Sequence, residues 1–326
     1  MDRRRALGVA LVLISACAFG SGALFAKPAY AAGVGWHVLS SWRFLFGASL
    51  AWLWLLAWPA HRQALRSLDR RLVLGSLALG VLYVGNSATY FAGLETVDAS
   101  LAALIVYVYP ALVAVLTLRF GRRLRGTRAW GALGLALVGV ILAVGGIDTT
   151  GAPPLDGLLL VVASPVIYAI WIVLAARLSG ERGEAGEDRA GGGAGAGVAA
   201  SAATALMMTA TATTYWLSAV VLGLPVGPGD VPAGAWFGLV GVGVVSTFVA
   251  IQAFYAGTQR VGAAQAALLS TIEPVWTISL AAILLRESLQ PIQLAGGALI
   301  LLGVVIAQTG PAALRPPQPV VRIADE

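Results

Sequence analysis

A carboxylate, Glu273, precedes Pro274 in the middle of a long apolar run, in the stretch STIEPVWTIS at residues 270–279. Pro274 cannot donate a hydrogen bond to the carbonyl of Ser270, so a helix through this stretch should kink or open there. An ionised carboxylate in apolar surroundings is costly unless it is paired, solvated or protonated. Glu273 therefore has four candidate roles: binding a cationic group of a substrate, carrying a coupling proton, pairing with an arginine, or helping to satisfy the backbone that Pro274 frees.

The composition indicates that these apolar surroundings are a lipid bilayer. Of 326 residues, 59% are hydrophobic and 11% are charged, against roughly 25% charged in a soluble domain. Apolar stretches of about 20 residues, the length that spans a ~30 Å hydrocarbon core, occur ten times. They lie at approximately 6–26, 37–58, 71–92, 98–118, 128–146, 155–176, 199–223, 233–255, 262–285 and 291–310. The sequence predicts an all-α membrane protein with ten transmembrane helices.

The basic residues predict the orientation of these helices. If Met1 is cytoplasmic, every Lys and Arg except Lys27, Arg43 and Arg286 falls on or near the inner side, and cytoplasmic loops carry such an excess. Both termini are therefore expected in the cytoplasm, in a multi-pass protein of the cytoplasmic membrane. A cleaved signal peptide is the alternative for the first stretch, but its apolar run is longer than a usual signal core. The formal charge of +6 is explained by membrane-flanking loops, so no nucleic-acid partner is expected.

The chain contains an internal repeat. Residues 91–141 align without gaps with residues 255–305, at an offset of 164, and 14 of the 51 pairs are identical. The identical pairs include Gly93 with Gly257, Pro110 with Pro274 and Gly139 with Gly303. Because the repeated unit has five predicted helices, an odd number, the second copy should enter the membrane from the opposite side. Such inverted repeats are typical of secondary transporters, which bind substrate near the midplane between the two copies.

The repeat divides the chain into two units of five helices. The first is expected at 1–150 and the second at 151–310. A Gly/Ala-rich linker at about 179–198 and a Pro-rich tail at 311–326 are both expected in the cytoplasm.

The segment GTQRVGAAQAALLSTIEPVWTISLAAILLRESLQPIQLAGGALILLGVVI, residues 257–306, resembles the EamA domain of the drug/metabolite transporter superfamily. The resemblance covers nearly the whole chain as two tandem copies. In that family the second copy carries a Glu-Pro pair, as at Glu273 and Pro274, and a Gly-Glu at the end of the same helix. This chain has Arg286 before Glu287, which puts a tight helix end there in question. The resemblance implies a ten-helix carrier without a cofactor, whose substrates are small polar or amphipathic solutes.

Polar and aromatic side chains at helical spacing predict which helix faces enclose a cavity, because lipid-facing polar groups would go unsatisfied. The alternative is that the same side chains join neighbouring helices. The candidate substrate-binding residues are Asn86, Tyr90, Tyr107, Tyr109, Tyr168, Trp171, Gln252, Tyr255, Glu273 and Trp276. Pro110 and Pro274, which are equivalent in the repeat, are predicted hinges on which the cavity opens alternately. Arg43 is a candidate ion-pair partner of Glu273.

The expected function is secondary transport of a small metabolite by alternating access, most simply the export of an amino acid or a related amphipathic solute, with proton coupling as an option. A passive channel or a receptor-like scaffold is the alternative, although nothing lines a continuous charged ring. An enzyme is less favoured, because Glu273 has no second carboxylate at its depth and the histidines, His37 and His61, fall at opposite faces. The single cysteine, Cys17, rules out a Cys-type metal site. The partners are a small solute and the bilayer, and the sequence carries no signal for oligomeric state.

Overall fold

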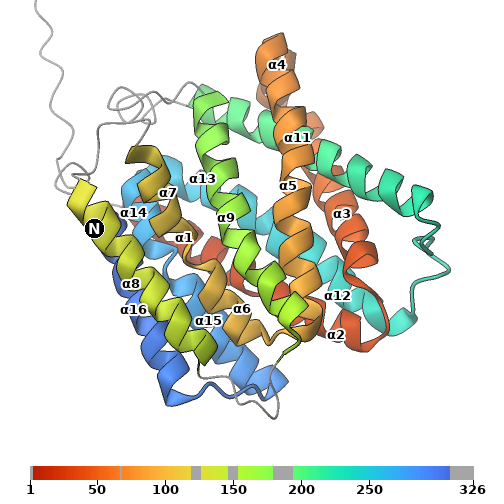
Figure 1. Ribbon diagram of the computed structural model, residues 1–326. Coiled ribbons are helices and arrows are strands. Elements are labelled where there is room, and N and C mark those ends of the chain that lie inside the picture. The colour runs from red at the N-terminus through yellow and green to blue at the C-terminus, as the bar shows by residue number, and fades with distance from the viewer. Residues whose placement is uncertain (1–2, 67, 119–125, 146–152, 179–193, 309–326) are drawn as a thin grey trace, which may run out of the picture.

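The computed structural model describes residues 3–66, 68–118, 126–145, 153–178 and 194–308 (Figure 1). All regular elements in these ranges are helical, as the sequence predicts. Most of the predicted linker at 179–198 and all of the predicted tail at 311–326 lie outside the described residues.

The helices of the first half follow the predicted apolar stretches, except for the short polar helix Pro59–Arg66, which lies between the second and the third stretch. They are α1 (Arg3–Gly20), α2 (Gly22–Ala31), α3 (Trp36–Ala57), α4 (Pro59–Arg66), α5 (Arg70–Thr96), α6 (Ala99–Val106), α7 (Tyr109–Leu118) and α8 (Gly126–Gly145).

The second half contains more breaks and two π-helical segments, η2 and η3. Its elements are α9 (Leu155–Leu178), α11 (Ala194–Val221), the 3-10 turn η1 (Ala233–Ala235), α12 (Trp236–Val240), η2 (Gly241–Val249), α13 (Ala250–Val261), α14 (Ala263–Leu269), α15 (Ile272–Leu280), η3 (Ala281–Leu285) and α16 (Pro291–Gln308).

Seven helical stretches in the described ranges are long and apolar enough to cross a membrane, judged by length and composition. They are Arg3–Ala31, Trp36–Ala57, Arg70–Thr96, Ala99–Leu116, Leu155–Leu178, Ala233–Val261 and Gln265–Leu285. Two shorter apolar helices, Trp130–Val144 and Pro291–Ala307, fall on the fifth and tenth predicted spans, and α11 falls on the seventh. The membrane class is confirmed, whereas the count of ten crossings stays a prediction.

The two halves contact each other through equivalent pairs of helices. Helix α5 packs along α9, and its counterpart α13 packs along α1. A Cβ atom on Gly93 of α5 would lie 2.7 Å from the carbonyl oxygen of Gly157. A Cβ atom on Gly257 of α13, which is 164 residues later, would lie 3.1 Å from the carbonyl oxygen of Gly8. Both glycines let two backbones approach closely, as small residues do in membrane bundles.

Helices α8 and α16 are counterparts that pack on each other at one edge of the molecule (Figure 1). A Cβ atom on Gly139 would lie 2.5 Å from the carbonyl oxygen of Gly296, and one on Gly303 would lie 2.7 Å from that of Ala132. Position 303 is the counterpart of 139, and position 296 is the counterpart of 132. The same contact is therefore made twice, once in each direction, which is the packing expected of a duplicated unit.

The fourth and ninth predicted spans are both broken in the middle. Helix α6 ends at Val106 and α7 begins at Tyr109, while α14 ends at Leu269 and α15 begins at Ile272. Pro110 and Pro274 lie in the first turn after each break, where the fixed φ of a proline suits the start of a helix. The predicted opening of the helix at Pro274 is confirmed.

A tight turn ends η3 and brings the second half onto the first. Arg286 has φ 58° and ψ 27°, and within the described ranges it is the only non-glycine residue with a positive φ. The tight helix end that the arginine put in question does form. The turn directs Glu287 to the start of α6, where its carboxylate oxygens accept hydrogen bonds from the backbone N–H groups of Ala99 and Ser100.

Candidate functional site

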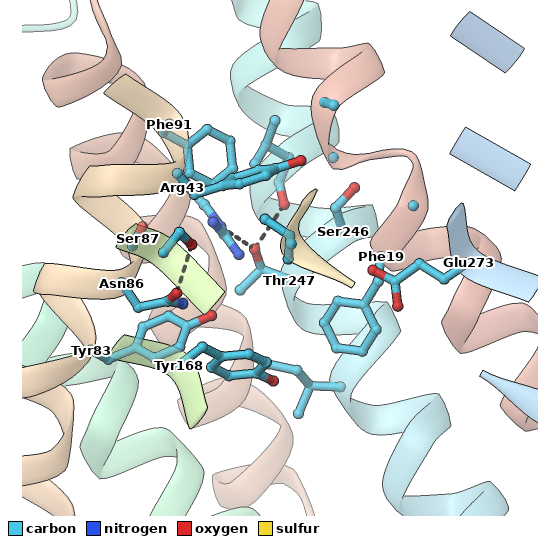
Figure 2. A pocket seen from close by; sticks show the side chains of 18 of the residues that line it. Phe19, Arg43, Tyr83, Asn86, Ser87, Phe91, Tyr168, Ser246, Thr247 and Glu273 are labelled. Atoms are coloured by element: carbon cyan, nitrogen blue, oxygen red, sulfur yellow. Dashed lines mark hydrogen bonds between the residues drawn. The ribbon is translucent and has the colours of Figure 1, made fainter. Parts of the chain in front are cut away.

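A cavity of about 370 Å³ lies between the helices (Figure 2). Side chains from α1, α2, α3, α5, α6, α7, α9, α11, η2, α13 and α15 line it. Eight of the ten predicted substrate-binding residues are on its wall, namely Asn86, Tyr90, Tyr107, Tyr109, Tyr168, Trp171, Tyr255 and Glu273. The polar faces of separate helices therefore meet at one place, as their spacing predicted.

Two predicted site residues and one predicted hinge are not on the wall. Gln252 and Trp276 do not line the cavity, and of the two prolines only Pro274 does. Trp276 is 36% exposed, and its Nε1 donates to Ser21 Oγ at 3.0 Å. Trp276 thus packs on the junction of α1 and α2 instead of facing the cavity.

Arg43 is buried on the cavity wall, with 8% of its surface exposed. Its Nε donates to Thr247 Oγ1 at 2.8 Å, and that hydroxyl donates to the carbonyl of Val242 at 2.9 Å inside η2. Its Cζ lies 4.8 Å and 4.7 Å from the ring centroids of Phe44 and Phe91. The two rings stabilise the cation, while the terminal nitrogens of the guanidinium have no acceptor among the described residues.

Glu273 lies away from Arg43, beside Phe19 on the other side of the view (Figure 2). The candidate ion pair between Glu273 and Arg43 is not formed in this structure. The carboxylate of Glu273 has no hydrogen-bond donor or ion-pair partner among the described residues. Glu273 is in the first turn of α15, where the helix dipole favours a negative charge. The cavity wall thus presents one carboxylate and one guanidinium that do not pair with each other.

Tyr107 contacts the backbone at the break that precedes Glu273. Its hydroxyl donates to the carbonyl oxygen of Ser270, which is the carbonyl that an N–H at position 274 would serve in a continuous helix. The backbone N–H of Glu273 donates to the same oxygen at 3.0 Å. The hydroxyl of Tyr107 is therefore engaged with protein and is not directed at a ligand.

Some of the other polar side chains on the wall form hydrogen bonds with the protein, and others have groups that do not. Ser164 Oγ donates to Asn86 Oδ1 at 2.9 Å, which leaves the Asn86 amide nitrogen without an acceptor in the described ranges. Trp171 Nε1 donates to the carbonyl of Leu79 at 2.9 Å. The hydroxyls of Tyr255 and Thr204 lie 2.8 Å apart. The tyrosine hydroxyls on the wall without a hydrogen bond to any described residue are those of Tyr83, Tyr90, Tyr109 and Tyr168.

The aromatic rings form a continuous surface on one side of the cavity. The ring centroids of Tyr109 and Tyr168 are 4.8 Å apart, and Tyr168 stacks on Trp171 at 5.9 Å. Tyr83 meets Trp171 at 5.2 Å. Such a surface suits an apolar part of a ligand, while the free hydroxyls suit polar atoms.

Sequence reasoning missed several residues of the site. Phe44, Phe91 and Thr247 hold Arg43, yet nothing in their own spacing marks them. The signal that could have found Thr247 is the polar pair Ser246-Thr247 within an apolar run. The hydroxyl of Ser246 is buried on the wall and has no hydrogen-bond partner within the described part of the chain. No group of three or more His, Cys, Asp or Glu side chains that could hold a metal ion occurs among the described residues.

Comparison with known proteins gives the class of this chain. The EamA-like transporter family matches residues 6–145 and 194–309, so the chain belongs to this family and with it to the drug/metabolite transporter superfamily. It is 28% identical over 305 residues to a protein of Archaeoglobus fulgidus named "Uncharacterized transporter", covering 92% of this chain and 96% of that protein. A solved crystal structure is 20% identical, with a TM-score of 0.62, covering 92% of this chain and 96% of that chain. The likeness to the crystal structure shows the fold, and the family and the relative point to a membrane transporter and not to an enzyme.

Proposed function

We propose that this transporter exports a small zwitterionic metabolite, an amino acid or a related amphipathic solute, across the cytoplasmic membrane by alternating access. One observation carries the proposal: the same cavity presents the carboxylate of Glu273 and the guanidinium of Arg43, and the two are not paired with each other. An ammonium group of the substrate would meet the first, and a carboxylate group would meet the second.

The charges favour a substrate that carries both signs. A buried charge without a partner is expensive, and removing one partner of a buried pair leaves the other uncompensated. A ligand with a single charge would satisfy one of the two groups and leave the other unpaired. A zwitterion satisfies both, and the two terminal nitrogens of Arg43 match a carboxylate in a bidentate geometry.

The remaining wall supports an apolar part next to the two charges. The cavity volume of about 370 Å³ is within the range of roughly 300–1,000 Å³ that is usual for small-molecule sites. The rings of Tyr109, Tyr168 and Trp171 offer apolar surface beside the free hydroxyls. An α-amino acid with an apolar side chain has this combination of groups.

The broken helices support alternating access. Breaks at equivalent places in the two copies, and helix contacts that recur at an offset of 164 residues, suit two halves that rock about a central cavity. Pro110 and Pro274 are the proposed hinges, with the two copies inverted in the membrane and both termini in the cytoplasm. In this cycle Glu273 alternates between a proton and the ammonium group of the substrate, which couples export to proton entry.

Counterflow of labelled amino acids in liposomes tests the proposal. Liposomes loaded with an unlabelled amino acid should accumulate its labelled form through the wild-type protein. Glu273→Gln and Arg43→Gln should each abolish this accumulation, while the charge-neutralising control Glu95→Gln, at the exposed end of α5, should leave it intact. If both Glu273→Gln and Arg43→Gln still show counterflow with wild-type affinity, the substrate does not bind between these two charges. Flux without counterflow would indicate a channel.

A further inference from the structure

We infer that Tyr107 is a positioning residue for Glu273: its hydroxyl takes the place of the backbone N–H that Pro274 lacks, and so fixes the broken helix in the form that presents the carboxylate to the cavity. This inference rests on the proposed role of Glu273 in binding substrate or proton.

The inference starts from the backbone hydrogen bonds at the break. In a continuous helix the carbonyl of Ser270 accepts a hydrogen bond from the N–H of residue 274, and proline has no N–H. In a membrane interior no water can replace a missing backbone donor, so another group of the protein has to do so. The Glu273 N–H at 3.0 Å uses one lone pair of the oxygen, and the Tyr107 hydroxyl uses the second. A side chain from the other repeat therefore replaces the backbone donor that is missing at the break.

The position of Tyr107 explains why it can do this. It lies directly after α6 at the first break, with 4% of its surface exposed. The two breaks thus contact each other, and the end of one helix segment holds the start of the other. A displacement of this contact would move Ser270, and the first turn of α15 with Glu273 would move with it.

The hydrogen bond from Tyr107 at the first break to Ser270 at the second has no counterpart in the opposite direction. Thr271 is the counterpart of Tyr107 at an offset of 164, and its Oγ1 donates to the carbonyl of Leu268 in α14 of its own repeat at 2.7 Å. The tyrosine therefore supports the break that carries the carboxylate, and its counterpart does not reciprocate. This asymmetry is expected if the contact serves Glu273 and not the fold of both repeats alike.

A double-mutant cycle without any ligand tests the backbone part of the inference. Tyr107→Phe removes the donor and keeps the ring, so it should lower the Tm of the purified protein. Pro274→Ala restores an N–H at position 274, so in that background Tyr107→Phe should have little further effect. Tyr109→Phe is the matched control, because its hydroxyl makes no hydrogen bond to a described residue, and it should leave the Tm unchanged. An equal loss of Tm from Tyr107→Phe in both backgrounds would overturn the inference.

Labelling of Glu273 by dicyclohexylcarbodiimide tests the positioning part. This apolar reagent adds to a carboxyl group in an apolar site, and the labelled peptide is quantified by mass spectrometry across a pH series. Tyr107→Phe should change the labelling rate of Glu273 about tenfold, as expected for the loss of one hydrogen bond of roughly 1.4 kcal/mol, and should shift its pH profile. Tyr109→Phe should do neither. A Tyr107→Phe protein with wild-type labelling would show that the tyrosine only stabilises the fold.

The two tests also separate this inference from the proposed function. If Glu273→Gln still gives wild-type counterflow while the Tyr107 cycle and the labelling behave as expected, the positioning of the carboxylate stands and its use in transport does not.

Discussion

The carboxylate of Glu287 accepts a hydrogen bond from the backbone N–H of Ser100 at 2.8 Å, and a second from Ala99 at 2.9 Å. This contact joins the end of the broken helix in one repeat to the start of the broken helix in the other. Lys27 Nζ donates to the carbonyl of Val97 at 2.7 Å beside it. A negative charge at the start of α6 is stabilised by the helix dipole as well as by the two N–H groups. Glu287 therefore joins the two repeats at the start of α6.

Removing this carboxylate should open the cavity at the start of α6. A cysteine in place of Ala103, which lines the cavity on α6, is introduced together with Cys17→Ser. Glu287→Ala in this background should raise the rate of labelling by a membrane-impermeant maleimide at least tenfold, because each of the two charged hydrogen bonds contributes roughly 1.5–3 kcal/mol and about 1.4 kcal/mol corresponds to a factor of ten. The reagent is added from the side of Glu287.

Glu95→Ala is the matched control for this experiment. The Glu95 carboxylate also accepts a hydrogen bond from a backbone N–H, that of Trp36, but both residues belong to the first repeat. Its removal should not change labelling of the introduced cysteine. Equal labelling rates in the two variants would mean that Glu287 does not hold the repeats together.

Arg286→Gly should make the protein more stable. A left-handed backbone at a non-glycine residue costs roughly 1–2 kcal/mol, and glycine recovers this at the expense of roughly 0.5–1 kcal/mol of chain entropy. The expected net gain is about 0.5–1 kcal/mol, seen as a higher Tm. Arg286→Ala removes the same side chain but keeps the strain, so a similar gain in that variant would assign the effect to the charge of the arginine.

The stability of the protein should depend on pH through the carboxyl group of Asp98, which lies near Glu287. Its partial burial and the negative charge of Glu287 raise the pKa of Asp98, and Lys27 partly offsets the rise. The folded protein therefore holds this proton more tightly than the unfolded chain, and the resulting stability, present below the unfolded pKa, is lost as the pH rises through the folded pKa.

Asp98→Asn should cancel this dependence. Asp98 precedes α6 without a side-chain capping bond, so the substitution removes no cap. The Tm of Asp98→Asn relative to wild type should rise from about pH 4, the usual pKa of an aspartate, and reach a plateau at higher pH. A Tm difference that is the same at every pH would contradict the role of the charge.

Helix α8 offers a matched pair of glycines for a packing test. A Cβ atom on Gly139 would lie 2.5 Å from the backbone oxygen of Gly296, whereas one on Gly134 would meet nothing within 4 Å. Gly139→Ala should therefore destabilise the protein by roughly 1–3 kcal/mol through overpacking. Gly134→Ala should be neutral or stabilising, because alanine is the better helix former. Equal Tm values for the two variants would argue against close packing of α8 on α16.

The sequence predicted the helices and much of the cavity, because both follow from local patterns. Apolar runs located the helices, Pro274 located a break, and helical spacing selected the faces that meet at the cavity. The pattern fails where a side chain depends on a distant neighbour. Trp276 shares a helix with Glu273 but turns to Ser21, and Arg43 is held by Phe91 from another helix. No periodicity in one segment specifies which segment packs on it.

The sequence also did not predict several irregularities of the backbone. The residues of the π-helical segment η2 would also suit an ordinary helix, and Arg286 takes a left-handed conformation that glycine usually adopts. The hydrogen bond between Tyr107 and Ser270 belongs to the same group. Proline shows that a carbonyl will lose its donor, but not which side chain will replace it.

The contact of α8 with α16, made twice in opposite directions, has an evolutionary consequence. A half-length ancestor with this surface would form the same two contacts with a second copy of itself, as in a symmetric dimer. With an acid at the position of Glu273, such a dimer would carry a carboxylate in both halves of the cavity. Gene fusion lets the two copies diverge: the counterpart of Glu273 at an offset of 164 is Tyr109. The fused chain can therefore have an acid at this position in one half and a tyrosine in the other, whereas the two identical chains of a homodimer have either two acids there or none.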